Sequence, residues 1–521
     1  MLNTLWPWLL DEPTISANLE ARARRSPDEL GLADEHGNSL TWAQFDASVD
    51  RVVAGLAAQG IGQGSRVCWQ LPMRISTVLV MFALRRLGAL QAPIIPIGRK
   101  REVSAAVRAV NAEFLLVPGT WNGFDYVELA GDLDLGDLAA PTIMEIGSTA
   151  PDADPDPGLR APQDPDEVAW VYFTSGSTGL PKGARHTDGT LLTTGRAFAG
   201  TGHIGENGDD VVAMAFPIAH VGGIEFLIAA ICSGTPMVIS EAFVPQAAVE
   251  LYSRMGVTLT GGAPPFYQAF AALAEAAAPA PLLPSLRTFK GGGAPCPPEL
   301  YYKVRDAMGV TVAHDYGMTE VPMVAVADPR DEPEVLAKTD GHPIEGNTVR
   351  LVDADGQEVT PGEVGEVQIS GSGVCRGYTD PVETEKAFTD DGWFRTGDLG
   401  RIHPGGQIEL VGRLKDVIIR KGENISPQEI EELLIAHPAI AEVAVIGVPD
   451  ADRGEMVCAV VTPAPDVDPP DLAAIVDFLS RAQVMKQKLP ERLELVESLP
   501  RTGLAKIARN ELRTRYGTPI G

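Results

Sequence analysis

The sequence predicts an α/β protein: a large N-terminal α/β part of several subdomains, a small β-barrel-like part and a small C-terminal α+β domain. Apolar helix and strand patterns alternate over residues 40–97 and 160–325. Such alternation is typical of a parallel sheet covered by helices. Short strand patterns separated by turns follow over 348–370, and a compact mixed unit begins after Gly412. These three kinds of sequence pattern define the predicted architecture.

In the first alternating region the patterns predict two helices and two strands. The helices are expected over 42–59 and 76–87, and the strands over 66–71 and 89–97. In the second region strands are expected near Val168, Val211, Met237 and Val310. The Asp- and Pro-rich stretch 150–165 is predicted to be a surface connection between the two regions.

Later segments read as short strands and then as a mixed domain. Strands over 349–352 and 365–369 predict a small antiparallel barrel or sheet. Ser426-Pro-Gln-Glu429 has the form of a capping box with proline at the first helical position, which predicts a helix ending near His437. The remaining elements expected are strands over 443–448 and 457–462, a helix from Asp471 and a strand over 493–496.

Composition and charge restrict the class of protein. Hydrophobic residues make up 45 % of the 521 residues and charged residues 21 %, which is ordinary for a globular protein. The net charge of -28 argues against nucleic acid or an anionic membrane surface as the partner, since both are polyanions. The five cysteines are scattered, as expected for free thiols in a reducing cytoplasm. No segment predicts a membrane span.

A short apolar strand, predicted over 168–173, leads directly into a loop of glycine and hydroxyl residues that ends in a lysine. Glycines bring backbone N–H groups close to an anion, hydroxyls add donors and the lysine adds a positive charge. The loop is not a Walker A motif, because Pro181 precedes the lysine and Gly183 follows it. These residues alone favour nucleotide binding and leave a surface linker open. The predicted phosphate-binding residues are Thr174, Ser175, Gly176, Ser177, Thr178, Gly179 and Lys182.

A second motif, His314-Asp-Tyr-Gly-Met-Thr-Glu320, follows a β-branched strand pattern. By itself it is compatible with an ordinary turn. Downstream of the first loop, however, it resembles the signature of the adenylate-forming superfamily, which includes acyl-CoA synthetases, peptide-synthetase adenylation domains and beetle luciferases. The resemblance implies that Tyr316 stacks on adenine, that Thr319 meets the α-phosphate, and that Glu320 and Thr178 hold Mg²⁺. It implies catalytic roles for Lys506, Glu320, Thr178 and Lys182.

Two segments between these motifs, 215–223 and 289–295, resemble the superfamily's pocket-lining segments. Residue type alone favours His220 as a core histidine, whereas the family position implies a pocket wall near the carboxylate. Glycines would let the backbone approach adenine and substrate without a Cβ in the way. The implied substrate contacts are His220, Val221, Gly222, Gly223, Gly291, Gly292, Tyr316 and Met318. The implied nucleotide contacts here are Gly293, Ala294, Pro295, Asp315, Tyr316, Gly317, Met318 and Thr319.

Motifs in the last quarter of the chain extend the resemblance. Asp398 and Arg413 match the carboxylate and guanidinium that bind the ribose hydroxyls, a task suited to an acceptor-only group and a fixed donor fork. Lys415 matches the hinge, Gly422 the pantetheine tunnel and Lys506 the adenylation lysine. Ala505 departs from the pattern, because glycine is usual there. The resemblance implies a nucleotide- and acyl-binding domain over 1–414 and a mobile C-terminal domain over 415–521.

The activity implied by the resemblance is ATP-dependent activation of a carboxylic acid to an acyl adenylate, followed by thioester formation with coenzyme A. The alternative is an adenylation enzyme that loads a carrier protein, disfavoured because the pocket segment lacks the aspartate that an amino-acid loader would use. A luciferase-like oxygenase is a third, less favoured class. The acid itself and the oligomeric state are not specified by the sequence, although the small residues at the pocket favour a bulky apolar acid.

Overall fold

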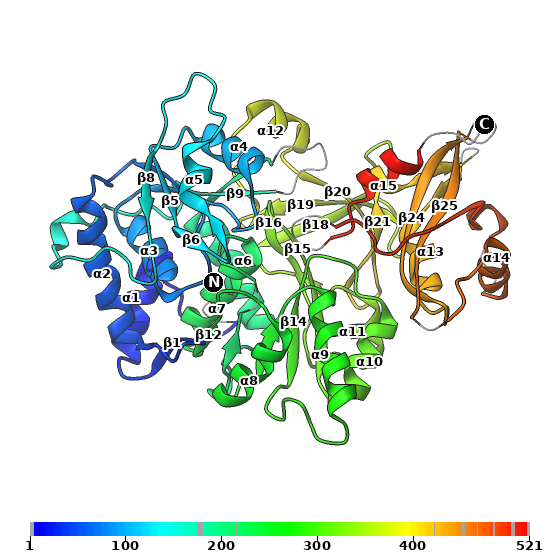
Figure 1. Ribbon diagram of the computed structural model, residues 1–521, viewed down its shortest axis with the longest axis horizontal. Helices are drawn as coiled ribbons and strands as arrows, with labels where there is room; N and C mark the ends of the chain where they lie inside the picture. Colours follow the sequence, from blue (N-terminus) through cyan, green and yellow to red (C-terminus); the bar gives the residue numbers. More distant parts are fainter. Residues whose placement is uncertain are drawn as a thin grey trace. The chain divides into compact units, whose positions relative to one another are not determined.

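The computed structural model describes residues 5–174, 181–214, 216–420, 423–450, 454–465, 467–482, 485–501 and 506–517. The chain folds into two compact units, each with its own internal contacts (Figure 1). The large unit comprises Met1–Val349 and Ile369–Phe394, and the small unit Arg350–Gln368 and Arg395–Gly521. This division concerns packing. The boundary expected between residues 414 and 415 concerns a hinge, and it stays a proposal.

The main sheet of the large unit has nine strands in the order β17-β16-β15-β14-β13-β11-β12-β1-β2. Its centre is parallel, and the pairs β1–β2, β15–β16 and β16–β17 are antiparallel. The strands are β1 Leu30–Asp34, β2 Ser39–Thr41, β11 Val212–Ala213, β12 Met237–Ile239, β13 Leu259–Gly261, β14 Thr288–Gly292, β15 Thr311–Met318, β16 Val321–Val326 and β17 His342–Pro343. The predicted parallel α/β architecture is therefore confirmed.

A second sheet in the large unit has six strands in the order β10-β9-β4-β3-β5-β8. Five strands are parallel, and β10 returns antiparallel to β9. The strands are β3 Arg66–Trp69, β4 Leu90–Pro93, β5 Phe114–Val117, β8 Thr142–Glu145, β9 Val168–Phe173 and β10 Gly183–Thr187. A small ribbon pairs β6 Thr120–Trp121 with β7 Phe124–Asp125. The β9–β10 pair flanks the predicted phosphate loop.

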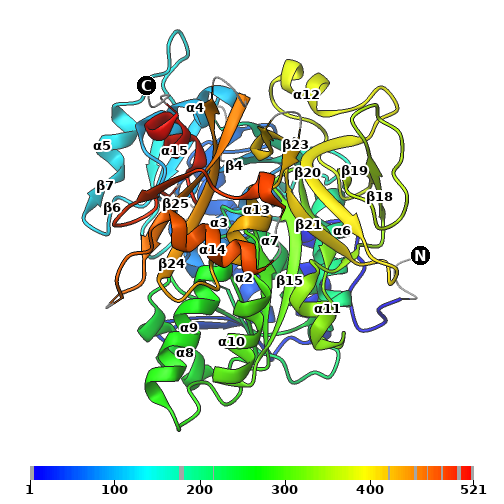
Figure 2. The ribbon, with the colours of Figure 1, turned by 90° about the vertical axis from the view of Figure 1, so that its right-hand side faces the viewer.

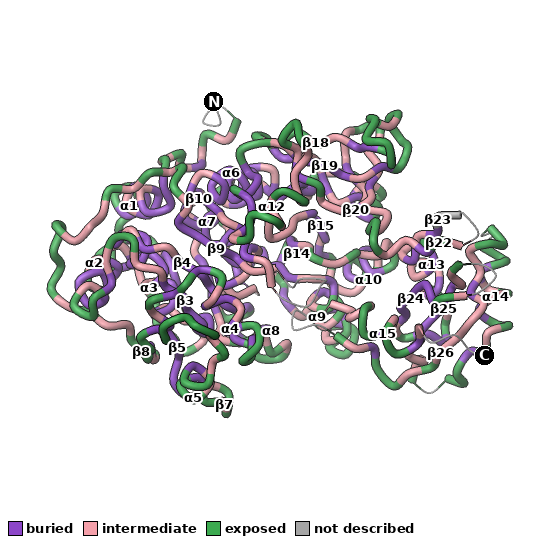
Figure 3. The backbone as a smooth tube through the Cα atoms, turned by 90° about the horizontal axis from the view of Figure 1, so that it is seen from above, coloured by how far each residue is buried: buried purple, intermediate pink, exposed green. Residues whose placement is uncertain are grey.

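Helices of the large unit include α2 and α3, which confirm the two helices predicted over 42–59 and 76–87. Helices α6 and α7 are buried along nearly their whole length (Figure 3). This is expected for α7, which is almost entirely apolar, whereas α6 also buries Asp188, Arg196 and several threonines. The helices are α1 Ile15–Arg25, α2 Trp42–Ala58, α3 Ile75–Arg86, α4 Lys100–Val110, α5 Tyr126–Gly131, α6 Asp188–Thr201, α7 Val221–Ser233, α8 Pro245–Met255, α9 Pro264–Ala277, α10 Pro298–Met308, α11 Pro333–Lys338 and α12 Pro381–Ala387.

The strands predicted over 349–352 and 365–369 belong to a four-stranded sheet in the order β18-β19-β20-β21. Its strands are β18 Asn347–Val352, β19 Gly365–Gly371, β20 Phe394–Ile402 and β21 Ile408–Arg413. The small unit also holds a five-stranded sheet, in which the long strands β24 and β25 lie side by side (Figure 2). Its elements are β22 Ile418–Arg420, β23 Glu423–Ile425, α13 Pro427–Leu434, β24 Ile440–Asp450, β25 Gly454–Pro463, α14 Leu472–Arg481, β26 Arg492–Leu495 and α15 Arg509–Tyr516. The strands predicted over 443–448, 457–462 and 493–496 and the helix predicted from Asp471 are confirmed.

The capping box predicted at the start of α13 is wrong, although the helix begins where expected. Ser426 occupies the N-cap position but makes no side-chain cap; its hydroxyl instead donates to the carbonyl of Val411 at 2.6 Å. Pro427, whose fixed φ suits the first helical position, starts the helix. The helix ends at Leu434, before the predicted end near His437, because the chain continues through tighter turns. None of the helices in the described part of the chain combines the length and apolarity of a bilayer span.

Candidate functional site

The base of the predicted phosphate loop is closed by its flanking residues. The backbone N–H of Thr174 donates to the carbonyl of Lys182 at 2.9 Å, and the N–H of Lys182 approaches the Thr174 hydroxyl at 3.4 Å. The structure therefore places these two predicted residues together where β9 ends and β10 begins. The other predicted members of the loop lie outside the described residues: Ser175, Gly176, Ser177, Thr178 and Gly179.

The Lys182 ammonium is held by two groups that the sequence did not single out. It forms an ion pair with Glu383 of α12 and lies 5.4 Å from the ring centre of Tyr378. Glu383 also pairs with Lys386 at 2.8 Å. Hydrogen bonds from Lys182 and Lys386 lower the pKa of Glu383 to about 2. Glu383 is therefore ionised at neutral pH and holds the lysine that the sequence assigns to phosphate.

Glu320 lies in the turn between β15 and β16, where the second motif ends. The hydroxyl of Tyr378 donates to its Oε1 at 2.5 Å, and the N–H of Cys375 donates to its carbonyl at 2.9 Å. Gly317 is required in this hairpin, because a Cβ there would lie 2.0 Å from the carbonyl oxygen of Pro322. Tyr316, Gly317, Met318, Thr319 and Glu320 are thus brought together on one hairpin, with Tyr316 buried and the other four partly exposed.

His186 was not identified from the sequence, yet it supports the same hairpin. Its ring lies on β10, and Nε2 donates to the carbonyl of Thr319 at 2.8 Å, since a carbonyl only accepts. The other ring nitrogen contacts the Thr190 hydroxyl at 3.0 Å. Burial lowers the pKa of His186 to about 4, so the ring is neutral near pH 7. The strand after the phosphate loop is therefore tied to the predicted α-phosphate residue.

The glycine segment at the end of β14 is shaped mainly by neighbouring backbone. A Cβ on Gly291 would lie 2.6 Å from the Gly262 carbonyl oxygen, and one on Gly292 would lie 1.9 Å from the Asp315 carbonyl oxygen. Gly293, at φ +93, would meet nothing within 4 Å. At Gly291 and Gly292 the neighbouring backbone alone already requires glycine, whereas a Cβ on Gly293 would have open space. Contact of these glycines with adenine or substrate stays a prediction.

Asp315, an expected nucleotide contact, uses its side chain inside the protein. Lys290 and Asp315 are 0 % and 2 % exposed, and the ammonium lies 3.1 Å from Asp315 Oδ1. The lysine also donates to the carbonyl of Ala327 at 2.8 Å. The N–H groups of Ala327 and Gly291 donate to the two Asp315 oxygens at 2.9 and 3.1 Å. The pair joins β14 and β15 to Ala327, the residue that follows β16, so a nucleotide contact at Asp315 would have to use its backbone.

His220 and the residues after it form the start of α7. His220 Nδ1 accepts from the N–H of Gly222 at 3.0 Å and so caps the helix, while its ring stacks on Phe216 with centroids 5.3 Å apart. Val221 is buried, and a Cβ on Gly223 would lie 2.2 Å from the Pro217 carbonyl oxygen. His220 is partly exposed and its ring caps a helix, so it is not the buried core histidine that residue type alone favours. Its contact with a substrate carboxylate remains a prediction.

In the small unit the predicted ribose residues face each other across β20 and β21. Arg413 Nε lies 2.8 Å from Asp398 Oδ1, and the two residues are directly paired in register. Asp398 is 3 % exposed, whereas the Arg413 side chain is 49 % exposed. Lys415 follows in a short turn and is exposed. The Asp398 carboxylate is therefore a fixed hydrogen-bond acceptor beside the forked donor of the Arg413 guanidinium.

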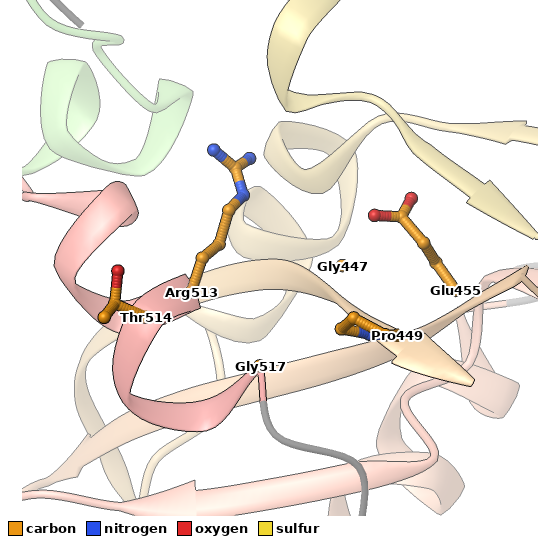
Figure 4. Close-up of a pocket in the computed structure, with 6 residues that line it drawn as sticks. All are labelled: Gly447, Pro449, Glu455, Arg513, Thr514 and Gly517. Atoms are coloured by element: carbon orange, nitrogen blue, oxygen red, sulfur yellow. The ribbon is translucent and has the colours of Figure 1, made fainter. Parts of the chain in front are cut away.

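The remaining small-unit predictions are placed only in part. Lys506 adjoins Ile507, which forms an isolated bridge with Arg501. Gly422 and Ala505 lie outside the described residues. The cavity drawn in Figure 4, about 410 Å³, contains none of the predicted site residues; it is lined by Gly447, Pro449, Glu455, Arg513, Thr514 and Gly517. Its Arg513 is paired with Asp416 at 2.9 Å, so its guanidinium already has a structural partner.

A resident metal centre is not built by this part of the molecule: the described residues include no group of three or more His, Cys, Asp or Glu side chains able to hold an ion. Glu320 offers one carboxylate beside the Tyr378 hydroxyl. Mg²⁺ is usually bound by one or two carboxylates together with substrate phosphates and water. The donor set therefore fits a magnesium ion that arrives with a nucleotide.

Comparison with known proteins agrees with this geometry. Residues 19–379 match the family model of AMP-binding enzymes, and residues 429–506 match the model of their C-terminal domain. The chain is 32 % identical over 505 residues to the medium-chain fatty-acid–CoA ligase of Escherichia coli (strain K12), covering 94 % of this chain and 88 % of that protein. It is also 32 % identical over 536 residues to the salicyl-AMP ligase / salicyl-S-ArCP synthetase of Mycobacterium tuberculosis, covering 98 % and 92 %. The fold matches ATP-bound MatB from Rhodopseudomonas palustris with a TM-score of 0.84 and 27 % identity, over 96 % of this chain and 99 % of that one.

Proposed function

Because this chain belongs to the adenylate-forming superfamily of AMP-binding enzymes, we propose that it is an acyl-CoA synthetase, which makes an acyl adenylate and transfers the acyl group to coenzyme A. Adenylation of a carboxylic acid is the reaction common to its relatives. The observation that carries the proposal is the cluster of Lys182, Tyr378 and Glu320, which sets a cation and a carboxylate beside the predicted phosphate loop.

In the first step a carboxylate oxygen of the acid attacks the α-phosphorus of ATP, and the bond to pyrophosphate breaks. Lys182 and Lys506 neutralise phosphate charge, and catalysis rests mainly on positioning and electrostatics. Mg²⁺, held by Glu320 and Thr178, would supply further charge neutralisation. Thr319 would contact the α-phosphate and Tyr316 the adenine, while the Asp398 carboxylate would accept hydrogen bonds from the ribose and Arg413 would donate to it.

In the second step the thiol of coenzyme A attacks the acyl carbonyl, and AMP leaves. We propose that residues 415–521 rotate about Lys415 between the steps, so that Lys506 leaves the reacting atoms and Gly422 lines the pantetheine tunnel. The alternative acceptor is the phosphopantetheine thiol of a carrier protein. It is favoured by the salicyl-AMP ligase / salicyl-S-ArCP synthetase, which is as similar to this chain as the fatty-acid–CoA ligase.

An acceptor competition distinguishes the two functions. The protein is incubated with ATP, Mg²⁺ and a panel of aliphatic, alicyclic and aromatic acids, and is offered free coenzyme A or a phosphopantetheinylated carrier protein. We expect acyl-CoA and AMP to form in equal amounts with at least one acid. Carrier acylation with no acyl-CoA from the same acid would overturn the coenzyme A assignment and establish the alternative.

Asp398→Ala is expected to weaken ATP binding by about 1.5–3 kcal/mol, the range for hydrogen bonds to a charged group. Calorimetric titration with ATP measures this. Glu409→Ala is the matched control, because Glu409 forms the other cross-strand ion pair of β20 and β21, with Arg401 at 3.2 Å. Equal ATP affinity in Asp398→Ala, Glu409→Ala and wild type would remove Asp398 from the ribose site.

A further inference from the structure

Tyr378 contacts two of the charged groups assigned to the nucleotide phosphates and their metal, Glu320 and Lys182. Its hydroxyl donates to Glu320 Oε1 at 2.5 Å, and its ring lies 5.4 Å from the Lys182 ammonium. We propose that Tyr378 is a positioning residue that fixes Glu320 and Lys182 relative to each other for binding a metal–nucleotide complex. This inference rests on the proposed function and adds a residue that the sequence motifs do not contain.

The backbone of Tyr378 is itself fixed to the elements that carry the two charged groups. Tyr378 bridges Ala184 of β10, and the N–H of Thr379 donates to the Gly183 carbonyl at 2.8 Å. Its own N–H donates to the Thr384 hydroxyl at 2.9 Å. Lys182 directly precedes β10, and Cys375, three residues before Tyr378, donates to the Glu320 carbonyl. Movement of the tyrosine is therefore restricted on both sides.

The chemistry of a phenol suits this position. A phenol keeps its proton at neutral pH, so the Tyr378 hydroxyl acts as a donor to the Glu320 carboxylate. A charge-assisted hydrogen bond fixes the orientation of the carboxylate. The negative face of the aromatic ring attracts the ammonium without neutralising its charge. Tyr378 thus holds a cation and an anion by two separate contacts and keeps both charges available to a ligand.

Glu383 completes the arrangement on the other side of Lys182. Its carboxylate pairs with both Lys182 and Lys386, so it keeps a partner when Lys182 turns toward a phosphate. The ring of Tyr378 stays in place during that exchange, because Tyr378 is only 6 % exposed. Tyr378 is therefore the fixed residue of the cluster, whereas Lys182 can exchange its partner Glu383 for a phosphate.

Tyr378→Phe tests this inference, because it removes the contact with Glu320 and keeps the ring beside Lys182. We expect the affinity for ATP with excess Mg²⁺ to fall about tenfold, equivalent to ~1.4 kcal/mol, with less than about a twofold change when EDTA removes the metal. Calorimetric titration measures both. The Mg²⁺ concentration that half-saturates pyrophosphate exchange should rise by a similar factor. Tyr126→Phe is the matched control, since Tyr126 is a buried tyrosine whose hydroxyl donates to the Pro96 carbonyl at 2.9 Å.

The outcomes separate this inference from the proposed function. If wild type shows no acid-dependent pyrophosphate exchange, the proposed function fails. If wild type is active and Tyr378→Phe binds Mg²⁺–ATP as tightly as wild type does, Tyr378 is not a positioning residue. If Tyr378→Phe loses the same amount of ATP affinity with and without Mg²⁺, Tyr378 has a general structural role, and this result would also overturn the inference. Should Tyr378→Phe not fold, Thr384→Ala removes the hydroxyl that accepts from the Tyr378 backbone, and the same metal-dependent loss, smaller in size, is expected.

Discussion

Lys506→Ala is expected to reduce the rate of adenylation by about 10²–10³-fold, the usual loss when one preorganised charge-stabilising group is removed. Given a pre-made acyl adenylate and coenzyme A, the same variant should still form thioester. The reason is the proposed rotation about Lys415, which takes Lys506 away from the reacting atoms before the second step. Single-turnover assays of each half-reaction, run separately, measure both rates.

Gly422→Leu should show the opposite pattern, because a side chain there would obstruct the pantetheine path while pyrophosphate exchange stays near normal. Lys488→Ala is the matched control: it removes a small-unit lysine that pairs with Glu429 at 2.7 Å and has no assigned role in either step. The rotation is contradicted if Lys506→Ala and Gly422→Leu each lose both half-reactions in parallel while remaining folded.

Lys290→Met is expected to destabilise the large unit by about 3–5 kcal/mol, since removing one partner of a buried ion pair leaves an uncompensated charge. Here that charge is Asp315, which is 2 % exposed. Because Asp315 directly precedes Tyr316 and accepts from the Gly291 N–H, the loss should extend to nucleotide binding. Chemical unfolding followed by tryptophan fluorescence reports on the large unit, which contains all seven tryptophans of the chain.

A second substitution should rescue the first. In Lys290→Met/Asp315→Asn no charge is buried, and most of the lost stability should return. Lys303→Met is the control, because Lys303 forms a half-exposed pair with Glu275 at 3.5 Å and such pairs contribute about 0–1 kcal/mol. Equal stability of the single and double variants would show that the buried pair is not what joins β14 and β15.

Periodicity and local motifs predicted the elements of the fold and much of the site. Strands β9 and β15 were expected because β-branched and aromatic runs lead into loops rich in glycine and hydroxyl residues, and both strands are present. The contacts that individual side chains make could be predicted less well from the sequence. The sequence around Ser426 is typical of a helix cap, yet its hydroxyl donates to a backbone carbonyl of β21 instead. That competing acceptor lies outside the local sequence, so the local pattern could not predict it.

The site residues missed by the sequence are those whose role depends on distant partners. Glu383 contacts Lys182 and Tyr378 contacts Glu320 across long separations in the chain, without forming a spaced motif with either. Gly291 and Gly292 were associated with ligand approach, since a glycine-rich segment does not reveal which atoms come close. In the structure the carbonyl oxygens of Gly262 and Asp315 lie close to where a Cβ on these glycines would be, so neighbouring backbone alone already requires glycine there.

Exchange of labelled pyrophosphate into ATP, measured against a panel of carboxylic acids, tests the central claim most directly, because exchange requires reversible formation of an acyl adenylate. The account predicts exchange that depends on the added acid and on Mg²⁺, persists without coenzyme A, and falls by about 10²–10³-fold in Lys506→Ala. A folded protein that binds ATP but supports no acid-dependent exchange with any class of acid would contradict it.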